Sequence, residues 1–577
     1  MPSRSGAASY FVCVAAGIGV ASVTTAESLY AQSIVRLDVA NDGTETYGGA
    51  TAVDVCDDAT KVVFATNVDG FDPTDVNGFG DVLLRDLAAG TTTLVSVWTN
   101  GNPGNQASSN PRISADGLFV AFDSDATNFV VGGDGNGVTD VFLRDLVAGT
   151  TTRVSVADDG SEANGASSLV AISGDGQRIL FLSDASKLVA NDRNGKSDLF
   201  LRDVAAGTTI RVSTAADGTE ADRAMFGGDL SSDGQVVLMI TDATNLVPGD
   251  TNHVVDVFVH DLVAGTVVRA SVASNGGELS WGSERNFDDF GAALSRDGRA
   301  VLFSTHQFDL VPNDWNEASD VFLRDLAAGT TTIVSVDSNG DVAAANDKRY
   351  GTFAHGLSSD RRFILLEGDA ATLAANGNFD ARAWDVYVRD QELAMTTRQS
   401  NDPHGFAGNW PSSGSRMTPD ARHVVFVSSA TDLIDGDPTY GPCVFMVTRP
   451  LRDATADPYG NGFAGTLGVP QLSASAPRLN QPCDVTLGNS SGAWTVALLM
   501  TGTDPAQIPT ALGGDLLVEP IWSRLVSVPA AGFDLATSLP PDERLAALDF
   551  YLQALELDPG AAHGVSFTTG LALRVGF

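Results

Sequence analysis

The residues best suited to chemistry lie in acidic loops that recur along the chain with the spacing D-x-N-x-x-x-D. Carboxylate and amide oxygens that alternate on a tight loop are the ligands that a hard cation such as calcium needs. The pattern therefore predicts candidate calcium ligands in five loops, and the sequence suggests no other cofactor. They are Asp75, Asn77 and Asp81; Asp134, Asn136 and Asp140; Asp192, Asn194 and Asp198; Asp250, Asn252 and Asp256; and Asp314, Asn316 and Asp320.

The same loops have a second interpretation, in which the Asp and Asn side chains only cap their own turns. A further Asp follows 11 residues after the first in each loop, as in an EF-hand. However, Asp140 and Asp145 would be separated by an extended strand, which puts them roughly 16 Å apart and too far to share an ion. Two later loops depart from the pattern, because Asn378 and Asp380 are out of register and Cys443 replaces the last Asp.

These loops belong to a longer repeat that must position them. Asp140 opens the segment DVFLRDLVAGTTTRVSV, and related segments begin at 81, 198, 256, 320, 385 and 443. β-Branched and aromatic residues between turn residues predict four strands in each unit. In the second unit they are Asn110–Ser114, Leu118–Asp123, Val141–Arg144 and Thr151–Val156. Four strands in each of seven units of about 60 residues predict an all-β, seven-bladed β-propeller, since a β-solenoid repeats at a much shorter period.

The seventh unit lacks its fourth strand. It contains His423–Val427 and Val444–Val447 and then stops at Pro450. The segment SIVRLDVANDG at residues 33–43 matches the fourth-strand segment TTRVSVADDG at 151–160. The sequence therefore predicts that an N-terminal strand completes the last blade, which removes an exposed sheet edge.

An Arg recurs at the end of five predicted third strands and suggests either a ring of ligands or ion pairs between blades, with ion pairs as the favoured interpretation. The set comprises Arg85, Arg144, Arg202, Arg324 and Arg389, with His260 in one blade. A second pattern, G-N-S-S-G at Gly488–Gly492, matches a nucleophile elbow, and Asp549, Asp558 and His563 follow in the order of an α/β-hydrolase. Because AWTVALLM after it predicts a strand and not a helix, we interpret it as a hairpin turn and predict no catalytic residue.

The repeat resembles a known family. The combination of S-x-D-G-x-x-V-x-F, D-V-F-x-R-D-L and A-G-T-T-T-R-V-S is similar to the WD40-like repeat of bacterial TolB-type propellers over residues 33–450. This resemblance implies an envelope or secreted protein with a role in protein or ligand binding, but the fold specifies no activity. Residues 451–470 predict a linker, and residues 471–577 predict a small β-sandwich, which resembles the C-terminal β-domain of many large secreted bacterial proteins.

The first 31 residues predict an export signal, with Arg4 before the apolar stretch Tyr10–Val23 and small residues after it. We therefore expect a periplasmic, cell-surface or secreted protein with no transmembrane segment after cleavage. Cys13 falls in this signal, and Cys56, Cys443 and Cys483 allow at most one disulfide. The propeller is then expected at residues 32–450.

The charge excludes one class of partner. The chain has 72 acidic residues against 34 Lys and Arg, a net charge of -38, which would repel nucleic acid. We expect a monomeric, non-catalytic binding or scaffold protein that holds a protein or glycan at the face carrying the acidic loops. The loops at 273–290, 337–354 and 401–412 would set specificity. One alternative is a glycan hydrolase or lyase with its site at the central channel, and another is a structural surface protein.

Overall fold

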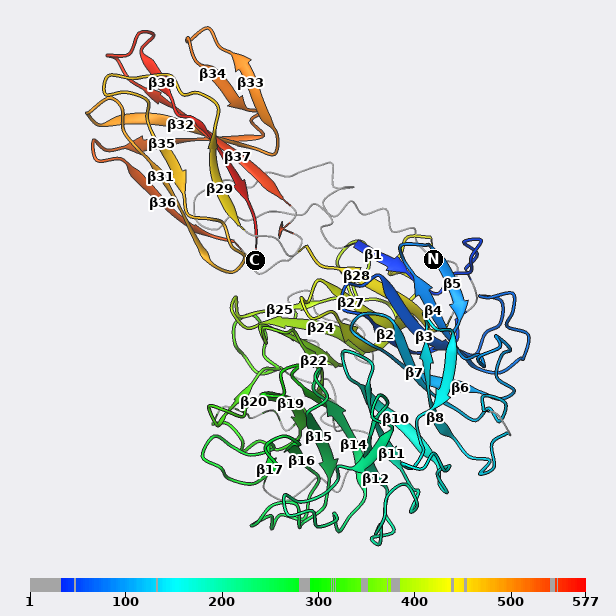
Figure 1. The fold of residues 1–577 in the computed structure, drawn as a ribbon. Coiled ribbons are helices and arrows are strands. Elements are labelled where there is room, and N and C mark those ends of the chain that lie inside the picture. Colours follow the sequence, from blue (N-terminus) through cyan, green and yellow to red (C-terminus); the bar gives the residue numbers. More distant parts are fainter. Residues whose placement is uncertain are drawn as a thin grey trace, which may run out of the picture. The chain divides into compact units, whose positions relative to one another are not determined.

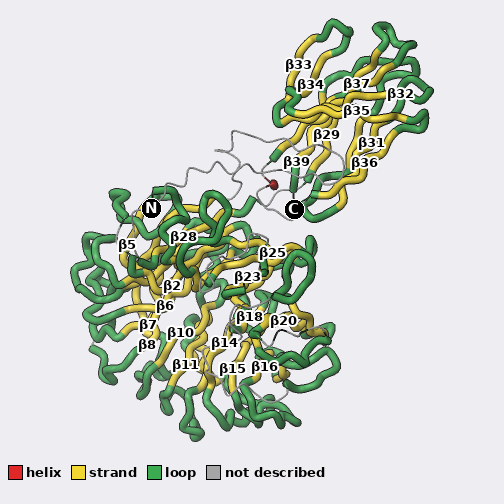
Figure 2. The backbone as a smooth tube through the Cα atoms, turned by 180° about the vertical axis from the view of Figure 1, so that it is seen from behind, coloured by secondary structure: helices red, strands yellow, loops and turns green. Residues whose placement is uncertain are grey.

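The computed structural model describes residues 33–576 apart from 46–47, 131–132, 280–290, 313, 315, 317, 344–350, 371, 375–383, 437–440, 451–453, 540–544 and 547. The predicted export signal, residues 1–31, lies outside the described residues. Strands and loops make up the described chain, with a short helical turn at 545–546 (Figure 2). Among these residues, no helix has the length and apolar character that a membrane crossing requires. Ile34–Thr448 form one compact unit, and Arg449–Phe577 belong to a second.

The first unit consists of seven antiparallel sheets of four strands each, which confirms the predicted seven-bladed propeller (Figure 1). Blade 1 contains β2 (Ala50–Val55), β3 (Lys61–Thr66), β4 (Asp81–Asp86) and β5 (Thr91–Leu94). Blade 2 contains β6 (Ser108–Ile113), β7 (Phe119–Ser124), β8 (Asp140–Asp145) and β9 (Thr150–Arg153). Blade 3 contains β10 (Ser167–Ile172), β11 (Arg178–Ser183), β12 (Asp198–Asp203) and β13 (Thr208–Arg211). Blade 4 contains β14 (Met225–Leu230), β15 (Val236–Thr241), β16 (Asp256–Asp261) and β17 (Thr266–Arg269).

The remaining three blades follow in the same order. Blade 5 contains β18 (Ala292–Leu294), β19 (Ala300–Thr305), β20 (Asp320–Asp325) and β21 (Thr330–Ile333). Blade 6 contains β22 (Thr352–Leu357), β23 (Phe363–Gly368), β24 (Asp385–Asp390) and β25 (Met395–Arg398). Blade 7 contains β26 (Ser412–Met417), β27 (His423–Ser428), β28 (Cys443–Thr448) and, from the other end of the chain, β1 (Ser33–Arg36). The pairing of β1 with β28 confirms the predicted closure, and Figure 1 shows the blue β1 beside the yellow β28.

The S-x-D-G motif forms the turn between the first two strands of a blade. In blade 2, the Ser114 hydroxyl donates to Asp116 Oδ1 (2.6 Å) and accepts the Phe119 N–H (3.0 Å). Asp116 Oδ1 also accepts the Leu118 N–H at 3.0 Å. Gly117 has a φ of 67°, a left-handed conformation that glycine adopts without a Cβ clash. The motif thus specifies the turn locally in each blade that carries it.

The Arg at the end of the third strand also serves its own blade. Arg144 Nη1 donates to the Gly149 carbonyl (2.9 Å) and to Thr151 Oγ1 (3.1 Å), both in the A-G-T-T hairpin. Arg85 and Arg324 make the same pair of bonds. The expected contact between blades is present for Arg202, Arg324 and Arg389, which donate to the Ala157, Ala273 and Asp337 carbonyls of the preceding blade. The partners are backbone carbonyls and not the acidic side chains that ion pairs between blades require, so that part of the interpretation is wrong.

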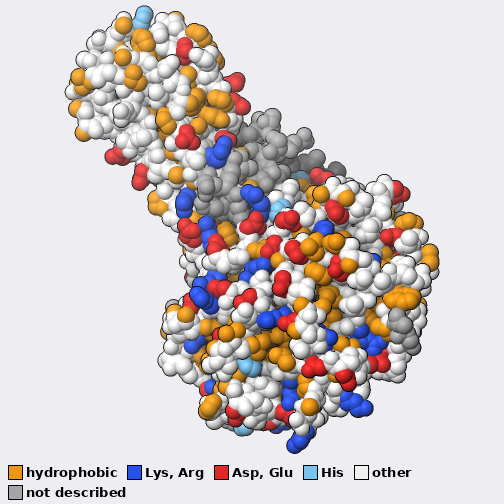
Figure 3. All heavy atoms as spheres, in the orientation of Figure 1, with side chains coloured by type: hydrophobic (Ala, Val, Ile, Leu, Met, Phe, Trp, Pro, Cys, Tyr) orange, Lys and Arg blue, Asp and Glu red, His pale blue; other side chains and the backbone are white. Residues whose placement is uncertain are grey.

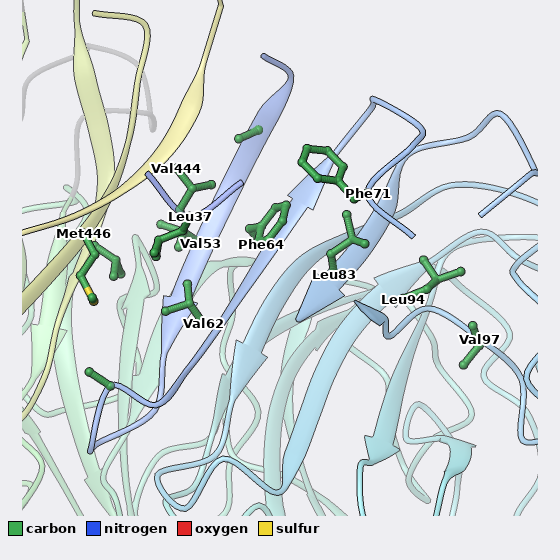
Figure 4. Packing of buried hydrophobic residues seen from close by; sticks show 13 residues of the cluster. Leu37, Val53, Val62, Phe64, Phe71, Leu83, Leu94, Val97, Val444 and Met446 are labelled. Atoms are coloured by element: carbon green, nitrogen blue, oxygen red, sulfur yellow. The ribbon is translucent and has the colours of Figure 1, made fainter. Parts of the chain in front are cut away.

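Adjacent blades share apolar cores. One core joins Leu37, Val444 and Met446 of blade 7 to Val53 and Phe64 of blade 1 (Figure 4). Burial of each such side chain contributes roughly 1.5–3 kcal/mol. Because the middle strands of every blade pack against neighbours on both faces, their sequences are continuous apolar runs.

The second unit contains two sheets with a shared core, as expected for a β-sandwich. The larger sheet consists of β29 (Thr455–Tyr459), β39 (Gly570–Arg574), β37 (Asp549–Leu557), β32 (Thr495–Gly502) and β35 (Trp522–Val528), with β38 (Val565–Phe567) beside β37. The smaller sheet consists of β30 (Leu472–Ala474), β31 (Pro482–Leu487) and β36 (Phe533–Ser538), and β33 (Pro505–Pro509) pairs with β34 (Asp515–Val518). Leu472 and Val485 of the smaller sheet pack in one cluster with Leu499, Val526 and Ala554 of the larger.

Two predictions for this unit are wrong. Strand β29 pairs with β39, so residues 455–459 of the expected linker 451–470 are part of the larger sheet. The Gly488–Gly492 segment is not a hairpin turn, because it connects β31 in one sheet to β32 in the other. Asn489 Oδ1 accepts the Ser491 and Gly492 N–H groups (both 2.9 Å) and stabilises this connection.

Ser490 and His563 of the hydrolase-like pattern make contacts within the interior and the loops of this unit. The buried Ser490 hydroxyl donates to Glu556 Oε2 at 2.6 Å. The His563 ring lies instead against Phe463, with ring centroids 5.9 Å apart. Ser490 is therefore a hydrogen-bonding group of the interior in this structure. The described cysteines Cys56, Cys443 and Cys483 are buried free thiols.

Candidate functional site

The predicted cation ligands of blade 2 surround an arginine side chain. Arg153, the last residue of β9, places Nη2 3.3 Å from Asp134 Oδ1 and Nη1 3.3 Å from Asp140 Oδ2. Its Nη1 also lies 2.5 Å from Glu162 Oε1. Carboxylate oxygens of these three acids lie within 4.8 Å of one another. The guanidinium thus supplies the positive charge that the acidic loop was expected to take from an ion.

Blades 3 and 4 repeat this arrangement. In blade 3, Arg211 lies 3.5 Å from Asp192, 3.8 Å from Asp198 and 2.7 Å from Glu220. In blade 4, Arg269 lies 3.0 Å from Asp250, 3.5 Å from Asp256 and 2.8 Å from Glu278. The structure therefore brings the two aspartates of each loop together as predicted, but around a side chain of the protein.

The asparagine of each loop has a role that corrects its prediction as an oxygen ligand. Asn136 Oδ1 accepts the Val138 N–H (2.9 Å), while Nδ2 donates to Asp140 Oδ2 (3.4 Å) and to the Ala163 carbonyl (3.0 Å). The amide N–H groups, and not the carbonyl oxygen, face the carboxylates. Asn77, Asn194 and Asn252 donate in the same way to Asp81, Asp198 and Asp256, and Asn316 donates to the Ala343 carbonyl. These five side chains act as turn caps.

Blades 1 and 5 have no arginine at this place, because β5 ends at Leu94 and β21 ends at Ile333. Asp75 is 6% exposed, and neither of its carboxylate oxygens has a well-formed hydrogen bond. The same holds for Asp314 Oδ1 and Asp320 Oδ2, which are also buried. Two of the five loops therefore contain a buried carboxylate pair without a guanidinium.

Burial raises the pKa values of these carboxyl groups. Burial and the nearby Asp81 charge raise the pKa of Asp75 to about 7. Burial raises the pKa of Asp314 to about 6 and, with the Asp314 charge, that of Asp320 to about 7. Desolvation favours the neutral form of a carboxyl group, and a second carboxylate adds repulsion.

The sequence analysis missed the arginines and glutamates of these clusters, although the repeat contains a signal for them. The Arg and Glu are nine residues apart in four blades: Arg36 and Glu45, Arg153 and Glu162, Arg211 and Glu220, and Arg269 and Glu278. The blades without Arg lack the Glu as well, since Leu94 is followed by Pro103 and Ile333 by Val342. Blade 6 differs, with Arg398 and Ala407, and its Arg398 lies 3.6 Å from Asp385. Asn378 and Asp380 of that blade lie outside the described residues.

A second candidate site is the central channel, where the first strands of all seven blades line a cavity of about 630 Å³. Four charged residues of its wall occupy the same fifth position of their strands. They are Asp54 in β2, Arg112 in β6, Asp229 in β14 and Arg416 in β26. Their blades are 1, 2, 4 and 7, so Asp54 lies between the two arginines in the order of the ring.

Most N–H donors of Arg112 and Arg416 are available to a ligand in the cavity. Arg112 Nη1 donates to the Pro111 carbonyl and Arg416 Nη1 to the Ser415 carbonyl, both at 2.9 Å. Arg416 Nε also lies 4.0 Å from Asp54 Oδ1. Burial and the positive charge of Arg416 lower the pKa of Arg112 to about 10, so Arg112 is still cationic at neutral pH. Two neighbouring guanidinium groups with spare N–H donors suit a carboxylate or another oxyanion.

The acidic residues of the channel join adjacent blades. Asp54 Oδ2 of blade 1 accepts the Ile113 N–H of blade 2 at 3.0 Å. Asp229 Oδ2 of blade 4 accepts the Leu294 N–H of blade 5 at 2.8 Å. Each carboxylate thus satisfies a backbone donor of the next blade's first strand.

An ion pair spans the channel near one end. Arg296 of blade 5 donates from Nη1 to Asp57 Oδ1 (2.9 Å) and from Nη2 to Asp57 Oδ2 (2.7 Å). Blades 1 and 5 are not neighbours in the ring, so this bidentate pair crosses the opening. The cavity wall also contains Phe353 of β22 and Trp384, whose rings stack with centroids 5.2 Å apart and an interplanar angle of 13°.

The acidic excess of the chain is not concentrated on the face of the propeller seen in Figure 3, where acidic and basic side chains are interspersed. Of the loops expected to set specificity, residues 280–290 and 344–350 lie outside the described residues. The channel is therefore the best-defined candidate ligand site of the described chain.

Comparisons with known proteins add only distant similarities. No protein-family model matches the sequence, and no curated protein matches it. Among solved structures, a putative TolB from Agrobacterium tumefaciens is 15% identical, with 62% of this chain and 97% of that chain covered and a TM-score of 0.31. The extracellular domain of a putative hybrid two-component system from B. thetaiotaomicron is 9% identical, with coverages of 94% and 59% and a TM-score of 0.36. A periplasmic gluconolactonase from Pseudomonas aeruginosa is 16% identical, with coverages of 65% and 94% and a TM-score of 0.30. Similarities of this extent carry no information about function.

Proposed function

We propose that this chain is an exported, non-catalytic binding protein whose central channel takes a small ligand with a carboxylate group, and that glycans containing uronic acid are the ligand class. The observation that carries the proposal is the pair of cationic side chains, Arg112 and Arg416, in the wall of the cavity. Guanidinium groups bind carboxylates through parallel, charge-assisted hydrogen bonds, which are about twice as strong as neutral ones.

The size and the aromatic lining of the cavity support this ligand class. Its volume of about 630 Å³ suits a mono- or disaccharide. The stacked Phe353 and Trp384 rings provide an apolar wall for the flat face of a sugar ring. A neutral apolar ligand would cover these half-buried guanidinium groups without pairing their remaining N–H donors, which is unfavourable for charged groups.

The non-catalytic part of the proposal is supported by the bonds of the channel carboxylates. Asp54 and Asp229 each accept a backbone N–H of the next blade, so they have a structural role. The main alternative, a glycan hydrolase or lyase, would use two such carboxylates as acid and base. Export is supported by the apolar stretch that follows Arg4 at the N-terminus.

Calorimetric titration of the mature protein tests the proposal, with oligogalacturonates as ligands and neutral oligosaccharides of equal length as controls. Charge-assisted hydrogen bonds contribute roughly 1.5–3 kcal/mol each, so Arg112→Ala and Arg416→Ala should each weaken binding by about 10-fold or more. Lys187→Ala removes one exposed positive charge outside the cavity and should leave the affinity unchanged.

Three results would contradict the proposal. They are absence of binding by acidic glycans, equal affinity for acidic and neutral glycans, and an affinity that neither arginine substitution changes. Incubation of the same glycans with the protein separates the alternative function. New reducing ends or unsaturated products, lost in Asp54→Asn or Asp229→Asn, would establish an enzyme.

A further inference from the structure

We propose that blades 1 and 5 each bind one calcium ion between their two loop aspartates, in the place that an arginine guanidinium occupies in blades 2, 3 and 4. The sites are the pair Asp75 and Asp81 and the pair Asp314 and Asp320. They lie at the loops of individual blades, so this inference is independent of the proposed channel ligand.

The comparison between blades of one chain defines the position of the ion. In blade 4, Arg269 Nη1 lies 3.0 Å from Asp250 Oδ1 and 3.5 Å from Asp256 Oδ2. The equivalent atoms of blade 5 are Asp314 Oδ1 and Asp320 Oδ2, and neither has a hydrogen-bond partner among the residues that the structure describes. The two atoms that bind a cationic group in blade 4 are thus unpaired in blade 5. In blade 1 the unpaired oxygens are both on Asp75, since Asp81 Oδ2 accepts the Asn77 amide N–H at 2.7 Å.

Burial makes the unpaired atoms costly. Asp75, Asp314 and Asp320 are at most 6% exposed, and their unpaired oxygens are closed to water. A buried carboxylate without a partner is one of the least favourable groups in a protein interior, because desolvation costs several kcal/mol. Either a metal ion or a proton could compensate these carboxylates.

The chemistry of the donors favours calcium among metal ions. The donor atoms identified at these sites are carboxylate oxygens, which suit hard cations and not zinc or copper. Magnesium gives up its water reluctantly and needs near-ideal octahedral geometry, whereas calcium accepts irregular sets of oxygens. A dry site with two carboxylates therefore favours calcium.

In both blades an aliphatic residue replaces the Arg, which agrees with a metal ion taking the place of the guanidinium. Leu94 and Ile333 stand where the other strands end in Arg, and Pro103 and Val342 stand where the partner Glu would be. Both members of the Arg–Glu pair are absent together, while the two aspartates and the asparagine remain. The carboxylate pair is retained where the guanidinium is not, as expected if another cation takes its place.

Calcium titration of the whole mature protein tests the proposal, after treatment with a chelator and at pH 7.5 in 150 mM NaCl. The salt screens weak binding to the acidic surface, since the Debye length is then about 8 Å. We expect two saturable sites and a melting temperature of the propeller that rises with calcium. Asp75→Asn and Asp314→Asn should each remove one site, and the double variant should remove both. Magnesium at equal concentration should bind more weakly.

Two further variants make the test specific. Asp250→Asn changes the equivalent residue of an arginine blade and should leave two calcium sites. Leu94→Arg combined with Pro103→Glu gives blade 1 the Arg–Glu pair of its neighbours and should remove one site. The proposal is overturned if millimolar calcium gives no saturable binding, if the double Asn variant keeps both sites, or if Asp250→Asn loses as many sites as Asp75→Asn. In the first case a proton shared by each carboxylate pair is the compensating species.

Discussion

The backbone N–H of Val444 donates to Oδ1 of Asp38 at 3.0 Å, although 406 residues separate the two in the chain. The same carboxylate binds the Arg36 guanidinium, with Nε to Oδ1 at 2.9 Å, and both side chains are buried. One aspartate of the closing strand thus satisfies a backbone donor of the last blade and a buried cation. It connects the N-terminal strand to the blade that the chain reaches last.

In the other blades, two residues together bind the equivalent backbone N–H. In blade 2, the Val141 N–H donates to Ser155 Oγ (3.2 Å), and that hydroxyl donates to Asp140 Oδ1 (2.6 Å). Asp38 stands at the repeat position of Ser155, and Cys443 stands at the position of Asp140. The carboxylate of the closing blade has therefore moved from the third strand to the fourth.

This exchange predicts the effect of substitutions at the closure. Asp38→Ala removes the buried carboxylate beside the Arg36 guanidinium and leaves the partly exposed Glu45 at 3.5 Å, which should cost about 3 kcal/mol. The double substitution Asp38→Ser with Cys443→Asp restores the arrangement of the other blades and should recover most of this loss. Urea denaturation measures both free energies of unfolding. An Asp38→Ala variant as stable as the parent, or a double variant no better than the single one, would contradict the assignment.

The arginine clusters make a second prediction. Arg153→Leu leaves Asp134, Asp140 and Glu162 without a cation and should lower the free energy of unfolding by about 3 kcal/mol. Arg153→Lys keeps a charge without the forked geometry and should lose less. Chemical denaturation at pH 7 is the measurement. If both variants were as stable as the parent, the cluster would contribute nothing to the fold.

A third prediction concerns pH. Burial raises the pKa of Asp123 to about 6, against hydrogen bonds from the Leu169 N–H, Asn110 and Ser168 that favour its charged form. Below the ordinary Asp pKa of 3.8 both states of the protein are protonated at this carboxyl. As the pH rises toward 6 the unfolded chain ionises first, so the free energy of unfolding falls by roughly 3 kcal/mol. Asp123→Asn should remove this fall between pH 4 and 6. Parallel stability profiles of the two proteins would show that Asp123 does not titrate in this range.

A fourth prediction uses the turn between the first two strands. Ala59 and Ala421 occupy the glycine position of this turn with φ values of 54° and 57°. A left-handed conformation costs a residue with a Cβ roughly 1–2 kcal/mol, and part of this is offset by the entropy of glycine in the unfolded chain. Ala421→Gly should therefore stabilise the propeller by about 1 kcal/mol. Gly298→Ala is the reverse control and should destabilise, since its new Cβ would lie 2.7 Å from Val236 Cγ2. A lower melting temperature of Ala421→Gly would contradict this account.

The number of blades, their turns and the closing strand were predictable from the sequence, because each depends on local patterns that recur in the seven repeat units. Strand residues alternate with turn residues over short spans, and the sequence of the segment at 33–43 matches that of the missing fourth strand. The acidic loops were also predictable as clusters, since Asp134 and Asp140 are only six residues apart. Their partner Arg153 comes from a neighbouring strand of the same sheet, and only the Arg–Glu spacing of nine residues marks it in the sequence.

The charged residues that line the channel come together only in the tertiary structure. Arg112 and Arg416 are 304 residues apart, and nothing in either segment marks them as a pair. They become neighbours of Asp54 only because the ring closes and brings blade 7 beside blade 1. Local patterns determine strands and turns, whereas the interaction of two distant charges depends on their separation in space. That separation is fixed only when the strand at the start of the chain pairs with the last blade.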